Sequence, residues 1–61
     1  MTRLSQWIVR EYDSKSDVEM TIARAQTEDG ARKILRDLES SAAPGVTYFA
    51  CHNVTGRELS V

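Results

Sequence analysis

Two stretches of the chain predict β-strands that are apolar on both faces. Residues 5–12 and 46–52 are rich in aromatic and β-branched side chains, which favour strands. The opposing faces carry Trp7 and Val9 against Ile8 and Tyr12 in the first stretch, and Val46, Tyr48 and Ala50 against Phe49 and Cys51 in the second. Because side chains alternate between faces along a strand, one helix can cover only one face of each. The other face is left for solvent, a second copy of the chain or a partner.

A further strand and one helix follow from the pattern between these stretches. Residues 18–24 alternate apolar and polar side chains, which predicts a half-buried strand. Thr27 is suited to cap the start of a helix, and Pro44 with Gly45 ends it. The apolar stripe of this helix, at the spacing of an amphipathic helix, consists of Ala31, Ile34, Leu35, Leu38 and Ala42.

The order of the elements predicts an α+β fold of the type β-β-α-β-β. Residues 53–56 are expected to form a hairpin loop, and residues 57–61 a short closing strand. A right-handed crossover, with the most apolar strands in the middle, gives a four-stranded antiparallel sheet in the order 2-1-3-4 with one helix on one face. Residues 1–61 are expected to form this single small domain.

The pairing of apolar side chains predicts the register of each hairpin and the core beneath the helix. A four-residue loop at 13–16 gives the opposing pairs Glu11–Val18, Val9–Met20, Trp7–Ile22, Arg10–Glu19 and Ile8–Thr21, and the second hairpin gives Ala50–Leu59 and Tyr48–Val61. The expected core is Trp7, Val9, Val18, Met20, Ile22, Ala31, Ile34, Leu35, Leu38, Val46, Tyr48, Ala50, Leu59 and Val61.

The open face of the predicted sheet is the candidate binding site. Its two middle strands carry Ile8, Arg10, Tyr12, Thr47, Phe49 and Cys51. Aromatic side chains and arginine are enriched in the centres of protein interfaces, so a homodimer or another protein partner is the favoured interpretation. In a second interpretation the face binds single-stranded nucleic acid, with bases stacked on Tyr12 and Phe49 and phosphates held by Arg10, Lys15 and Arg57. In a third, the register differs and these side chains pack under the helix.

Two other surfaces are also candidate binding sites. The second strand lacks proline and has few charges, so its edge could add to the sheet of another chain. Arg32 and Arg36, one helical turn apart with Lys33 beside them, could contact an acidic partner or phosphates. Their acidic neighbours on the helix favour an ordinary solvated face instead.

Length, charge and cysteine content narrow the class of protein. A domain of 61 residues buries only about 60% of the surface that its unfolded chain exposes, less than larger domains do, and is expected to gain stability by oligomerisation. Cys51, the single cysteine, cannot form an internal disulfide, and one Cys with one His cannot fill a zinc site. The eight Lys and Arg residues nearly balance nine Asp and Glu residues, which argues against a dedicated duplex DNA or RNA binder. With no membrane-spanning run or signal peptide, a cytoplasmic location is expected.

No residue pattern indicates catalysis. Cys51 and His52 are adjacent, but neighbouring strand residues point to opposite faces, so thiol and imidazole do not meet. His52, near a loop, is interpreted as a solvated polar residue. The sequence therefore predicts a small non-catalytic interaction module that associates with itself, another protein or both, with no metal and no cofactor. Its shortness suits a phage or mobile-element product, although no residue indicates that origin.

Overall fold

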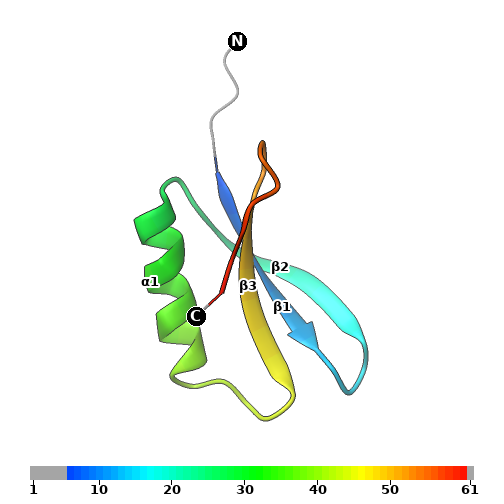
Figure 1. Ribbon diagram of the computed structural model, residues 1–61. Coiled ribbons are helices and arrows are strands. Elements are labelled where there is room, and N and C mark those ends of the chain that lie inside the picture. Colours follow the sequence, from blue (N-terminus) through cyan, green and yellow to red (C-terminus); the bar gives the residue numbers. More distant parts are fainter. Residues whose placement is uncertain (1–5, 61) are drawn as a thin grey trace.

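The computed structural model describes residues 6–60 and contains a four-stranded antiparallel sheet with one helix (Figure 1). The elements are β1 (Trp7–Asp13), β2 (Val18–Ala25), α1 (Glu28–Glu39), β3 (Val46–His52) and β4 (Glu58–Leu59). The strands lie in the order β2-β1-β3-β4, and each neighbouring pair is antiparallel. The predicted α+β class and strand order are confirmed.

Local interactions define the start of α1 and the connection that follows it. The Oγ1 atom of Thr27 accepts a hydrogen bond from the amide of Gly30 at 3.0 Å, so the predicted helix cap is present. After the helix, Gly45 has a φ angle of 86°, a left-handed conformation that glycine adopts without a steric penalty. The Gly45 carbonyl accepts hydrogen bonds from both the amide and the hydroxyl of Ser14, each at 2.9 Å. The connection after the helix is thus joined to the β1–β2 turn.

The core lies between α1 and one face of the sheet. The β1–β3 register pairs Trp7 with His52 and Val9 with Ala50. The buried residues are Trp7, Val9, Ala31, Leu35, Ala50 and Leu59, with Ala23, Ala25, Ile34, Leu38 and Tyr48 packed partly buried against them. The predicted helix stripe is confirmed from Ala31 to Leu38, whereas Ala42 lies beyond the end of α1; the predicted Ala50–Leu59 pair is confirmed.

The predicted register of the β1–β2 hairpin is wrong by two residues. Asp13 belongs to β1 and pairs with Val18, so the turn occupies residues 14–17 instead of 13–16. Glu11 pairs with Met20. Asp17 adopts a φ angle of 55°, a left-handed conformation that Asp tolerates better than most residues. This geometry at the end of the turn lets β1 continue through Asp13.

A β-bulge in β2 changes which side chains face the core. Thr21 pairs with Arg10 and Ala23 pairs with Val9, which leaves Ile22 as an extra residue. Without the bulge, alternation from Val18 would place Arg24 on the core face. With it, Ala23 takes the core face and Arg24 pairs with Ile8 on the other face. The bulge therefore keeps a cation out of the core, where an unpaired charge is costly.

Three side chains predicted for the core are exposed. Val18, Met20 and Ile22 retain 46, 51 and 38% of their accessible surface. The 12 residues of α1 span about 18 Å, whereas the 8 residues of β2 span about 26 Å, so the helix cannot cover the whole strand. The turn end of the β1–β2 hairpin projects away from α1 (Figure 1). Val46 is half-buried, and Val61 lies outside the described residues.

Candidate functional site

The six residues predicted for the open face do lie together on one face of the sheet. The β1–β3 register sets Ile8 opposite Cys51, Arg10 opposite Phe49, and Tyr12 opposite Thr47. Opposing residues in an antiparallel pair share a face, and these three pairs alternate with the pairs that contribute to the core. Thr47 is exposed and the other five are half-buried. We refer to these six residues as the open face: Ile8, Arg10, Tyr12, Thr47, Phe49 and Cys51.

The helix lies on the opposite side of the sheet from the open face. Ala31 and Leu35 of α1 are buried in one cluster with Trp7 and Val9, whose side chains point away from the open face. None of the described helices or strands covers the open face. Its five half-buried side chains therefore have no covering helix or strand among the described residues.

Charged groups surround the apolar centre of the open face. Arg10 forms an ion pair with Glu19 of β2, with 3.2 Å between Nη1 and Oε1. The Nε atom of Arg10 is buried without a hydrogen-bond partner, so its guanidinium is held close to the sheet. The Tyr12 hydroxyl donates a hydrogen bond of 2.7 Å to Asp17. That hydrogen bond raises the pKa of Tyr12, so its hydroxyl remains a donor at neutral pH.

Cys51 lies on this face as a protonated thiol. Burial raises its pKa, and the negative charge of Glu58, which pairs with it from β4, acts in the same direction. A reactive cysteine needs the opposite shift, because the thiolate is the nucleophile. The environment of Cys51 therefore favours packing over chemistry.

His52 faces the other side of the sheet and has a structural role. Its ring meets Trp7 edge to face, with 4.9 Å between centroids and 80° between planes. Its Nδ1 atom accepts hydrogen bonds of 3.1 Å from the amides of both Val54 and Thr55. The interpretation of His52 as a solvated residue is thus wrong, because the ring is half-buried and organises the β3–β4 loop.

The three cations predicted to hold phosphates are not gathered around the open face. Arg10 lies on it, but in the ion pair with Glu19. Lys15 belongs to the β1–β2 turn, where its side chain approaches Gly45. The guanidinium of Arg57 lies 5.9 Å from the centre of the Trp7 ring, on the core side of the sheet. Arg57 also makes an ion pair of 3.8 Å with α1, through Glu28.

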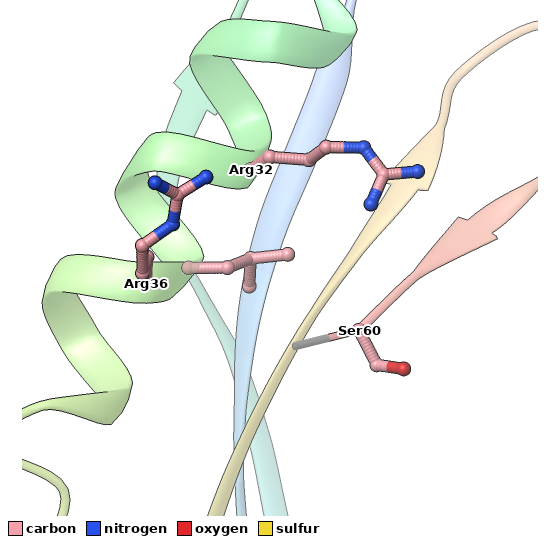
Figure 2. A pocket seen from close by; sticks show the side chains of 4 residues that line it. Arg32, Arg36 and Ser60 are labelled. Carbon is pink, nitrogen blue, oxygen red and sulfur yellow. The ribbon is translucent and has the colours of Figure 1, made fainter.

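A shallow hollow lies between α1 and the C-terminal segment. Its volume is about 190 Å³, and its lining comprises Arg32, Leu35, Arg36 and Ser60. Figure 2 shows the Arg32 side chain extending from the helix toward the strands, with Ser60 across the hollow. Ligand pockets usually enclose about 300–1,000 Å³. The Nε atom of Arg32 is paired with Glu28 at 3.2 Å, which reduces the positive charge available at this hollow.

Sequence reasoning missed a second apolar surface, on β2. We define the β2 strip as Val18, Met20 and Ile22, the three side chains exposed at the edge of the sheet. A signal for it was present in the sequence. The second predicted strand ends in Arg24. Simple alternation would place Arg24 on the same face as Val18, so its charge would be buried in the core. The strand is also longer than the helix that covers the sheet.

Neither a metal site nor a membrane-spanning helix is present among residues 6–60. Within this range, no group of three or more His, Cys, Asp or Glu side chains is placed to hold a metal ion. None of the helices in the same range is long and apolar enough to cross a membrane. In comparisons with known proteins, no family model, curated protein or solved structure matched the chain.

Proposed function

We propose that this protein is a small non-catalytic interaction module that binds a protein partner through the open face. The observation that carries the proposal is the apolar centre formed by Ile8, Phe49 and Cys51, which no described helix or strand covers. An uncovered apolar patch with a polar rim is the usual composition of a protein interface.

The groups around this centre favour a protein over a nucleic acid. Glu19 and Glu58 stand on the same face as Phe49, because they pair with open-face residues on the neighbouring strands. Phosphates would meet these carboxylates; of the two arginines on this face, Arg10 is already paired with Glu19, and Arg24 stands opposite Ile8. Binding of single strands usually requires a positively charged groove beside the stacking aromatics. A protein surface can instead offer apolar side chains to the centre and hydrogen-bonding groups to the rim.

The character of the face also suits binding better than catalysis. The Cys51 thiol is kept protonated by burial and by Glu58. His52 points to the opposite face, and its Nδ1 atom is occupied by two loop amides. Covalent catalysis requires a nucleophile, a base and an orienting group within hydrogen-bond reach of one another. The described residues of the open face do not supply that set.

The test is a comparison of three forms of the chain as bait in a lysate of the source cell, with bound proteins quantified by mass spectrometry. Phe49→Arg places a charge at the centre of the open face. Val54→Arg is the matched control, because it introduces the same charge at an exposed apolar residue of the β3–β4 loop. A partner retained by wild type and Val54→Arg but lost by Phe49→Arg supports the proposal.

Two results would contradict the proposal. One is capture of the same proteins by all three forms when circular dichroism shows that each is folded. The other is tight binding of a single-stranded oligonucleotide that weakens steeply with added salt and is lost in Phe49→Arg. Phosphate contacts are released by salt, whereas an apolar interface is little affected by it. That second result would make the nucleic-acid function the correct one.

A further inference from the structure

The β2 edge combines unpaired backbone groups with exposed apolar side chains. β2 is the outer strand of the sheet and has β1 as its neighbour on one side. Four large apolar side chains of the described residues are exposed, and three of them form the β2 strip. The fourth, Val54, belongs to the β3–β4 loop. Three of the four exposed large apolar side chains of the described residues therefore lie on one edge strand.

Such an edge is suited to one kind of occupant, a β-strand. Natural edge strands are commonly protected by lysine, proline or very short length. β2 has 8 residues and contains neither lysine nor proline. Its protective features are two charged side chains, Glu19 and Arg24, and the bulge at Ile22, which interrupts the regular edge after Thr21. A strand from another chain would pair with the backbone from Val18 onward and cover the β2 strip at the same time.

The sequence of β2 is complementary to itself in one register. Two copies related by a twofold axis perpendicular to the sheet pair antiparallel about a central residue, with both helices on the same face. Centring on Glu19 would set this carboxylate against its own copy, which is unfavourable. Centring on Thr21 would set Val18 against Arg24 and run through the bulge. Centring on Met20 avoids both the like-charge pair and the Val18–Arg24 pair, and it reaches the bulge only at its end, at Ile22.

We infer that a second copy of the chain binds at the β2 edge, in the register centred on Met20. In this register Met20 meets its own copy, and Val18 of each chain meets Ile22 of the other. Alternation along β2 is unbroken up to Ile22, so these apolar side chains lie on one face of the joined sheet. Glu19 lies opposite Thr21, with no like charge facing it.

The dimer has a consequence for the proposed function but does not depend on it. Because the twofold axis is perpendicular to the sheet, the product is one eight-stranded sheet with two helices on one side. The two open faces then lie together on the other side. A partner with two binding segments could engage both faces, and such linkage raises the overall affinity without new contacts.

Sedimentation equilibrium of the full chain, over a wide concentration range at low and high salt, tests the dimer. Met20→Lys is expected to weaken self-association by about tenfold or more, because a charge would enter the centre of the interface. The variant should still fold, since Met20 is 51% exposed. Val54→Lys is the matched control, with the same substitution at another exposed apolar residue, and should associate as wild type does.

Disulfide trapping tests the register. In a Cys51→Ser background, Met20→Cys is expected to form a covalent dimer on mild oxidation, because paired residues across antiparallel strands lie within disulfide range. Val54→Cys in the same background should form far less. A wild type that is monomeric at every concentration would overturn the inference. So would a Met20→Lys variant that associates as strongly as wild type, and loss of association in Phe49→Arg alone would assign it to the open face.

Discussion

Two substitutions of valine by alanine, Val9→Ala and Val18→Ala, compare the stability contributed by the buried end of the sheet with that contributed by its exposed end. Val9 is completely buried beneath α1, whereas Val18 keeps 46% of its surface exposed. Both valines lie on the same face of the same hairpin. The sequence pattern alone places both in the core, so the two substitutions would be expected to cost the same without the structure.

The structure predicts unequal losses of unfolding free energy. Each substitution removes two carbon groups, worth about 0.8 kcal/mol each when fully buried, or about 1.6 kcal/mol. Val9→Ala also leaves a cavity, which brings its expected cost to about 2–3 kcal/mol. Val18 is about half exposed, so its substitution loses roughly half of that transfer free energy, and water fills the space left by the two methyl groups. The cost should therefore stay below about 1 kcal/mol. A folded domain of 61 residues is stabilised by about 3–9 kcal/mol in total.

Urea unfolding of the wild type and both variants measures the difference. Circular dichroism follows the helix, and fluorescence of the buried Trp7 follows the core. The experiment is run at a concentration at which sedimentation shows monomer, so that losses at a dimer interface do not contribute. Equal costs for the two variants would refute the placement of the β1–β2 hairpin relative to α1. A larger loss of unfolding free energy at Val18 than at Val9 would show that Val18 belongs to the core, as the sequence pattern predicts.

Three further predictions follow from the turns and from the open face. Gly45→Ala should lower the free energy of unfolding in urea more than Gly56→Ala does. Both glycines have a positive φ angle, so alanine at either position costs about 1–2 kcal/mol of backbone strain. Only at Gly45 would the new Cβ also lie 3.2 Å from Ser14 Oγ. His52→Ala should speed hydrogen exchange of the two loop amides that bond to Nδ1, whereas His52→Asn, which keeps an acceptor, should retain part of the protection; equal exchange in both variants would count against the loop contact. Cys51 should be alkylated more slowly in the native chain than in urea at neutral pH, because its raised pKa lowers the thiolate fraction. The difference between the two alkylation rates should narrow as the pH rises. Equal rates at neutral pH would contradict the raised pKa of Cys51.

Features that depend on neighbouring residues were predictable from the sequence. The Thr27 cap needs only the amide three residues ahead, and the apolar stripe of α1 needs only helical spacing. The β3–β4 register follows from a short loop, which leaves few ways to pair the flanking strands, and Ala50 indeed pairs with Leu59. The membership of the open face followed from strand alternation in β1 and β3, which contain no bulge in their mutual pairing.

The β1–β2 hairpin was mispredicted because its geometry depends on packing from elsewhere. Ala25 packs beside the first turn of α1, where a Cβ added to Gly30 would lie in ordinary contact, 3.5 Å from the Ala25 Cβ. The bulge at Ile22 places Ala25 on this core face and moves Arg24 to the other face. Alternation within residues 18–24 carries no information about the position of the helix. Arg24 and the length of the strand indicate that simple alternation fails, but only the position of the helix places the β2 strip outside the core.

Both candidate surfaces have one physical origin, the mismatch between a single short helix and a larger sheet. One helix can cover one face, so the open face remains, and at about 18 Å it cannot reach the far half of β2, so the β2 strip remains. A longer helix would bury the strip but would leave the backbone of the β2 edge unpaired. A second copy at that edge pairs the backbone and covers the strip together, whereas it leaves the open face free. We therefore propose self-association at the edge and partner binding at the face, and we expect the Met20 and Phe49 variants to remove the two separately.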